Sequence, residues 1–99
     1  MMQQQTAPKA RTKSWTLNLE IAEESKDATT VEAALDTGER TLRTQATAQR
    51  NPGDPPAPEI GDEYAAGRAL LDLGRQLLRM ATVDAAANEK SASHEPPAR

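Results

Sequence analysis

The first third of the chain alternates apolar and polar residues with the period of a β-strand. From about residue 14 to residue 23, the apolar side chains fall on every second position, at Trp15, Leu17, Leu19 and Ile21. Successive side chains of a strand point to opposite faces of a sheet. This spacing therefore predicts a strand with one buried face.

The same alternation continues on both sides of a turn at residues 36–39 that contains Gly38. Glycine adopts a positive φ without steric cost, so this turn predicts a hairpin between two further strands. The polar residues 23–27 predict a turn between the first and second strands. The residues that alternate on one face are Val31, Ala33 and Leu35 in the second strand and Leu42, Thr44, Ala46 and Ala48 in the third.

A proline-rich stretch at residues 50–58 interrupts this pattern with four prolines. We interpret it as a stiff spacer rather than as a polyproline ligand for a partner, and we expect no helix to begin within it. Beyond it, apolar or small residues recur at alternating steps of four and three, which predicts one amphipathic helix over about 61–87. They are Ile60, Tyr64, Gly67, Leu71, Gly74, Leu78 and Ala81.

The order of these elements predicts an α+β fold in which a three-stranded antiparallel sheet (β-β-β-α) carries one long C-terminal helix on one face. We expect one domain over residues 13–87, a disordered arm over 1–12 and a disordered tail over 88–99. The predicted core comprises Trp15, Leu17, Leu19, Ile21, Val31, Ala33, Leu35, Leu42, Ala46, Tyr64, Leu70, Leu71, Leu77 and Leu78.

Such a core is small, and neither a disulfide nor a metal reinforces the predicted fold. Self-association would cover more apolar surface, since a three-stranded sheet has two open edges and one uncovered face. We therefore predict a homodimer, with edge-strand and face-to-face geometries both open. Trp15 and Tyr64 are expected to pack near each other. Gly67 and Gly74 are expected to let the helix approach the sheet, a reading we favour over a helix–helix seam.

Composition and charge narrow the range of partners. The mean hydropathy is -0.75, and the net charge is -3, from 12 Lys and Arg against 15 Asp and Glu. Three of these bases, Lys9, Arg11 and Lys13, lie in the first thirteen residues, which contain no acid, so the rest of the chain is acidic. Nucleic-acid backbones are bound mainly by concentrated basic surfaces, which this composition does not favour.

The cysteine count is zero, which excludes a disulfide scaffold and thiolate chemistry. Together with an N-terminus that has no apolar signal segment, this predicts a cytoplasmic protein. The single histidine, His94, lies in the predicted tail, where no second group would orient it for general-base or metal-binding work. We expect no enzyme activity, no cofactor and no metal.

Several runs of residues resemble a known family: 15–19 (WTLNL), 50–54 (RNPGD) and 58–63 (PEIGDE), followed by 66–73 (AGRALLDL). They resemble small actinobacterial proteins of unknown function with a double-stranded-RNA-binding-domain-like (dsRBD-like) fold. The resemblance spans about residues 13–87 and implies the β-β-β-α fold, a small size and dimerisation, but no activity. A looser similarity of architecture to ribosome hibernation factors makes ribosome association an alternative, although a fold does not establish a function.

The resemblance does not imply duplex-RNA binding in the usual mode. Double-stranded-RNA-binding domains have an additional N-terminal helix and basic groups that contact phosphates across two minor grooves. Here only about a dozen tail-like residues precede the first strand, and the first turn contains Glu23 and Glu24. The helix also opens with Asp62 and Glu63, and carboxylates at these places repel phosphate.

We therefore interpret the chain as a non-catalytic, homodimeric protein-interaction module. The alternative is a ribosome- or RNA-associated stress or hibernation-type factor that uses the basic arm and arginines of the third strand. No membrane association is expected. The residues that could contact a protein partner or RNA are Arg40, Arg43, Arg50, Arg68, Arg75 and Arg79.

Overall fold

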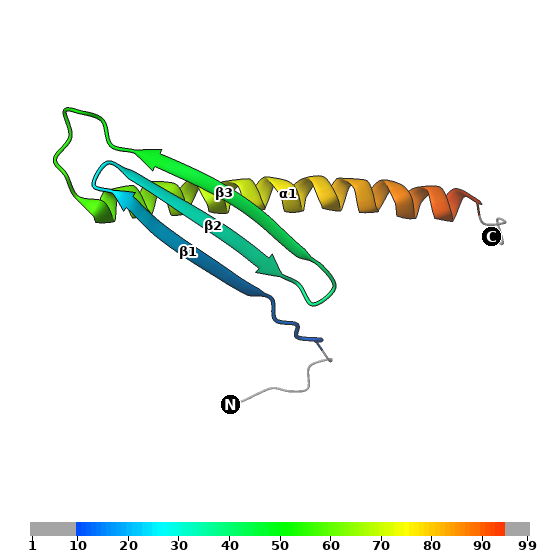
Figure 1. Cartoon of the computed structure of the whole chain (residues 1–99). Coiled ribbons are helices and arrows are strands. Elements are labelled where there is room, and N and C mark those ends of the chain that lie inside the picture. The colour runs from blue at the N-terminus through cyan, green and yellow to red at the C-terminus, as the bar shows by residue number, and fades with distance from the viewer. Residues whose placement is uncertain (1–9, 95–99) are drawn as a thin grey trace.

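The chain forms a three-stranded antiparallel sheet crossed on one face by a single long helix (Figure 1). A computed structural model describes residues 10–94, and the side chains of residues 10–89. The strands are β1 (Thr16–Ser25), β2 (Ala28–Asp36) and β3 (Thr41–Gln49), in the order β1-β2-β3, and the helix is α1 (Pro58–His94). The predicted α+β fold class is confirmed.

Two tight turns connect the strands. Lys26 and Asp27 join β1 to β2, next to an irregularity in pairing between Glu23 and Ser25. At the β2–β3 turn, Gly38 has a φ of +91°, and its N–H donates a 2.8 Å hydrogen bond to Oδ1 of Asp36. The glycine predicted for this hairpin is therefore required by the conformation of the turn.

The helix is longer at both ends than its predicted span of 61–87. It begins at Pro58, because proline lacks only an N–H group that would have no partner in the first helical turn. The expectation that no helix could begin within the proline-rich stretch was wrong. The helix continues to His94, so residues 88–94 are helical where a disordered tail was predicted. Residues 1–9 of the predicted arm and 95–99 of the predicted tail lie outside the described residues.

The core lies between α1 and the two strands β2 and β3. Val31 and Ala33 of β2 are fully buried, and so are Ala65 and Ala69 of α1. Because alanine is small, these residues let the helix axis come close to the sheet. Leu73 lies on the same side of α1, one turn after Ala69. Leu35 and Ala48 complete the buried cluster, with Leu19, Leu42, Ala46, Ala66 and Leu77 packed at its margin.

Half of the predicted core is solvent-exposed instead of buried. The helix lies mainly over β2 and β3, so β1 is only partly covered, and the helical stripe spaced by four and three points away from the sheet. Trp15 and Tyr64 do not pack together, because Tyr64 lies near the end of β1 and Trp15 precedes its start, about 30 Å away along the strand. The exposed residues are Trp15, Leu17, Ile21, Tyr64, Leu70, Leu71 and Leu78.

Candidate interaction surfaces

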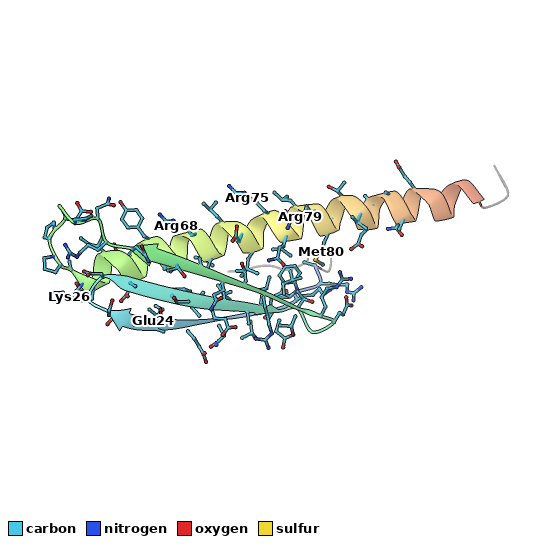
Figure 2. The ribbon with its side chains drawn as sticks, turned by 45° about the horizontal axis from the view of Figure 1, so that its top comes forward. Glu24, Lys26, Arg68, Arg75, Arg79 and Met80 are labelled. Atoms are coloured by element: carbon cyan, nitrogen blue, oxygen red, sulfur yellow. The ribbon has the colours of Figure 1, made fainter. Side chains whose placement is uncertain are left out.

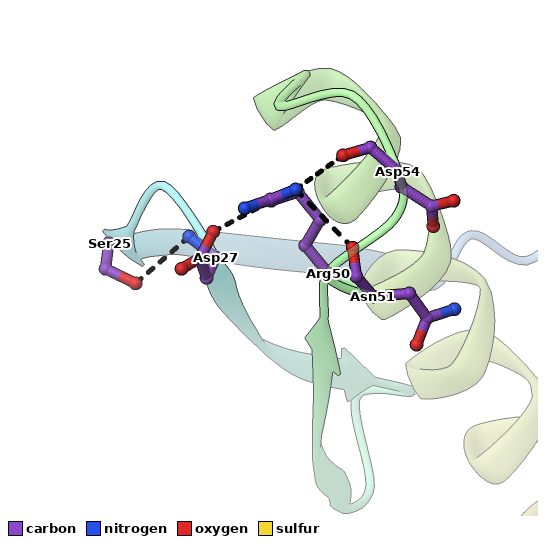
Figure 3. A network of polar contacts seen from close by, with 5 residues as sticks. All are labelled: Ser25, Asp27, Arg50, Asn51 and Asp54. Atoms are coloured by element: carbon purple, nitrogen blue, oxygen red, sulfur yellow. Dashed lines mark hydrogen bonds and ion pairs between the residues drawn. The ribbon is translucent and has the colours of Figure 1, made fainter.

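Arg50, which directly follows β3, links the proline-rich loop to the β1–β2 turn through hydrogen bonds (Figure 3). Its Nε lies 2.8 Å from Oδ1 of Asp27, and its backbone N–H donates to the Asp27 carbonyl at 2.8 Å. The guanidinium also donates to the backbone carbonyls of Asn51 and Asp54. Nε and Nη1 of Arg50 are therefore engaged within the chain, which gives this predicted contact residue a structural role.

Arg68 is held against the same end of the sheet. Its guanidinium donates a 2.8 Å hydrogen bond to the carbonyl oxygen of Thr47 on β3 and lies 5.8 Å from the centre of the Tyr64 ring. Between Arg68, Arg50 and Lys26 there is an open hollow of about 490 Å³ with proline and tyrosine walls. Acidic Asp27 and Asp54 also line it, so its charges nearly balance.

The remaining arginines lie elsewhere. Arg40 and Arg79 line a shallow hollow at the other end of the sheet, next to Met80, while Arg43 is an exposed residue of β3. Arg75 is 3.6 Å from Asp72 on the same helix. Figure 2 shows Arg68, Arg75 and Arg79 following one another along α1. The structure thus distributes the six predicted contact residues over both ends of the molecule and does not gather them into one basic patch.

Two carboxyl groups meet where β1 ends and α1 begins. Glu23 lies close to Asp62, and the hydrogen bond and negative charge of Asp62 raise the pKa of Glu23 above its ordinary value of 4.5. Glu59 adds a smaller effect of the same sign. Oδ1 of Asp62 is buried and finds no hydrogen-bond partner among the described residues. The contact between these elements is therefore favoured when Glu23 is protonated.

Apolar side chains are exposed along β1. Trp15, Leu17 and Ile21 are 50%, 44% and 47% exposed, although the register places Leu17 and Ile21 on the face that α1 covers over β2. We call these three residues the β1 strip. It adjoins the unpaired edge of β1, a position at which another chain can be accommodated.

A second exposed apolar surface follows the side of α1 that faces away from the sheet. We call it the outer seam, and it consists of Ile60, Tyr64, Gly67, Leu71, Gly74, Leu78 and Ala81. Its four large side chains are 48–71% exposed. Nothing lies within 4 Å of a Cβ built on Gly67 or Gly74. These glycines therefore do not serve close packing on the sheet, and the reading favoured from the sequence was wrong.

The described part of the chain contains neither a candidate metal-ligand cluster nor a candidate membrane-spanning helix. Among those residues, no group of three or more His, Cys, Asp or Glu side chains is placed to hold a metal ion. Within the same residues, no helix combines the length and apolar character required to span a bilayer.

Comparison with known proteins assigns the chain to a family. A family model described as Rv2632c-like matches residues 13–94. The chain belongs to the Rv2632c-like family. An uncharacterized protein of Mycobacterium tuberculosis, MT1780, is 38% identical over 82 residues, which cover 83% of this chain and 82% of that protein. Rv2632c of the same species is 34% identical over 76 residues, 77% of each chain.

The crystal structure of Rv2632c has the same architecture. It matches with a TM-score of 0.70 at 30% sequence identity, over 88% of this chain and 98% of that chain. The predicted membership of a small actinobacterial family of uncharacterized proteins is thus confirmed at the level of the Rv2632c-like family. The dsRBD-like relationship remains a prediction.

The sequence contained a signal for the true sheet-facing side of α1. Ala65, Ala69, Leu73 and Leu77 recur every four residues, and this stripe meets the sheet. The larger and more conspicuous stripe, with a mean spacing of 3.5 residues, is typical of a helix that packs against another helix. The sheet covers one of these two apolar stripes, and the other is exposed.

Proposed function

We propose that this Rv2632c-like protein is a non-catalytic, cytoplasmic interaction module that self-associates into a homodimer. The observation that carries the proposal concerns the side chains of residues 10–89, among which nine large hydrophobic ones are exposed and the largest that is fully buried is Val31. Monomeric soluble proteins seldom expose contiguous apolar surface of this kind without using it. The lack of cysteine supports a reducing compartment.

Seven of these nine residues lie on two surfaces, the β1 strip and the outer seam. Isolated exposed leucines are common on protein surfaces, but rows of them along one strand and one helix face are typical of interfaces. Neither surface contains a charged residue. Burial of such surfaces is driven by the hydrophobic effect, so we expect self-association to persist at high salt.

Binding to a ribosome or to RNA is the alternative function. It would depend on arginines, of which Arg50 and Arg68 are already engaged by Asp27 and by backbone carbonyls. Arg43 lies on the face of the sheet that α1 does not cover. Glu20 of β1 and Glu32 of β2, which pair with each other, lie on the same face. This mixture of charges supports a protein partner over a phosphate backbone.

The proposal is tested by sedimentation equilibrium at micromolar concentration in low and high salt. We expect a mass of twice 10.7 kDa in both buffers. A mass of one chain throughout the concentration range would contradict self-association. Co-sedimentation with ribosomes tests the alternative, which requires retention that falls with salt and that Arg43→Glu weakens, with Glu39→Gln in the exposed β2–β3 turn as the matched control.

A further inference from the structure

We propose that two copies of this chain associate through the outer seam of α1, with the two helices antiparallel and the two sheets on the outside. The inference rests on the proposed self-association and specifies its surface and geometry. The second copy is the occupant because the seam is complementary to itself.

The spacing of the seam is that of a helix–helix contact. Its seven positions alternate steps of four and three from Ile60 to Ala81, a mean period of 3.5 residues, and none of them is charged. Apolar residues repeated in this way keep one side of a helix facing a partner helix. The seam lies on the side of α1 opposite to Ala65, Ala69 and Leu73, which face the sheet. A helix from a second copy can therefore reach the seam without meeting the sheet that packs on the other side of α1.

Gly67 and Gly74 leave gaps between the large apolar side chains of the seam. A side chain at Gly67 or Gly74 would meet nothing within 4 Å, and yet glycine is an unfavourable residue inside a helix. The neighbouring seam residues Leu71 and Leu78 project beside these holes and are 58% and 71% exposed. Knobs and holes therefore alternate along one surface, which is the arrangement that interdigitating helices require.

Size complementarity selects the antiparallel orientation. A parallel pair would place glycine against glycine and leucine against leucine in successive layers, so that no single separation of the helix axes suits both. An antiparallel pair with its two-fold axis between Asp72 and Leu73 places a large residue against a small one in each layer. These layers pair Leu71 with Gly74, Gly67 with Leu78 and Tyr64 with Ala81.

The Leu70 flank and the area agree with this arrangement, while the opposite flank brings Arg68 and Arg75 of the two copies near each other, each held by a contact in its own chain. Leu70 of one copy would lie beside Leu77 of the other, which extends the apolar contact on one side of the seam. Covering the exposed parts of the four large seam residues and Leu70 would remove roughly 500 Å² per copy, or about 1,000 Å² per pair, which reaches the lower limit of a specific interface. The exposed fractions of these five side chains range from 42% to 71%.

The seam is tested by sedimentation of the full chain with the variants Leu71→Glu and Gly74→Leu. Glutamate would bury an unpaired charge, and leucine would fill the hole that the partner's Leu71 enters. We expect each variant to raise the dimer dissociation constant by at least about 100-fold. Both sites face open space in the single chain, so far-UV circular dichroism should show the same fold as wild type.

Ile21→Glu in the β1 strip is the matched control, since Ile21 is as exposed as the seam residues but lies on another surface. It should leave the dimer intact. A wild-type dimer that survives Leu71→Glu and Gly74→Leu overturns the seam while self-association stands. A wild-type chain that stays monomeric overturns the proposed self-association itself.

Orientation is measured separately with a spin label on Glu63→Cys, because the chain has no other cysteine. Antiparallel helices centred between residues 72 and 73 place the two labelled positions roughly 30 Å apart, at about 1.5 Å of rise per residue. Parallel helices would place them about 10 Å apart, and that result would overturn the antiparallel geometry.

Discussion

Gly61 and Gly67, six residues apart on one helix, are glycine for different reasons. A Cβ at Gly61 would lie 2.9 Å from Oγ1 of Thr29, a buried side chain of β2, so the helix can approach the sheet there only without a side chain. At Gly67 a Cβ would meet nothing within the chain. The same substitution should therefore have opposite effects at the two positions.

We expect Gly61→Ala to lower the free energy of unfolding by about 1 kcal/mol, because the added methyl group overpacks a tight contact. Gly67→Ala should raise it by up to about 1 kcal/mol through helix propensity. Urea unfolding in a Leu71→Glu background, which removes self-association, measures both changes. Equal effects at the two sites would show that the contact with Thr29 carries no cost.

The second residue-level prediction concerns Glu23, whose pKa is raised in the folded chain by the hydrogen bond and charge of Asp62. The folded state therefore holds this proton more tightly than the unfolded state. The resulting stabilisation is complete below about pH 4.5 and is lost as the pH rises through the raised pKa of the folded state. The pair of carboxylates then repels at neutral pH.

Glu23→Gln removes this repulsion. We expect the variant to melt at a higher temperature than wild type at pH 7, with a difference that shrinks toward zero near pH 4. Thermal unfolding across this pH range measures it, with Glu39→Gln in the exposed β2–β3 turn as control. A difference that stays constant with pH would mean that titration of Glu23 is not its cause.

Among the elements, α1 is longer than the sheet that it covers, and its C-terminal part runs past the strands (Figure 1). The described side chains from Ala81 to Glu89 are all exposed. Its last part includes three consecutive alanines at 85–87, which favour a helix without tertiary contacts. This segment adds little to the packing of the single chain.

Ending the chain after Ala87 should therefore change the free energy of unfolding by less than about 0.5 kcal/mol, a value typical of surface changes. Urea unfolding of the shortened and full-length chains in the Leu71→Glu background measures the difference. Ending the chain after Asp72 is the contrasting case, because it removes the buried Leu73 and should destabilise the fold severely.

The strands were predictable because their alternation is local and the two turns use ordinary turn residues. The sheet-facing side of α1 was not, since the helix has two apolar stripes and the larger side chains, such as Leu71 and Leu78, lie on the outer one. The contacts of the predicted site residues could not be predicted from the sequence either. Arg50 meets Asp27 from 23 positions away, a pairing that follows only from the register of the sheet.

At the scale of the whole molecule, the proposed self-association would be linked to folding. If two copies bind only when folded, the folded state gains stability with concentration by mass action. We expect the melting temperature of wild type to rise with protein concentration and that of Leu71→Glu to stay constant. Differential scanning calorimetry over a concentration series measures this, and a concentration-independent wild type would contradict the linkage.

The position of α1 at the end of the chain has a consequence for synthesis. The sheet is complete at Gln49, whereas Leu73, the last buried residue of its cover, follows 24 residues later. At about 5–20 residues per second, the nascent sheet waits roughly 1–5 s for the helix. During that interval its apolar face and both edges are open to neighbouring nascent chains. Until Leu73 is made, no part of the chain completes the cover over this apolar face.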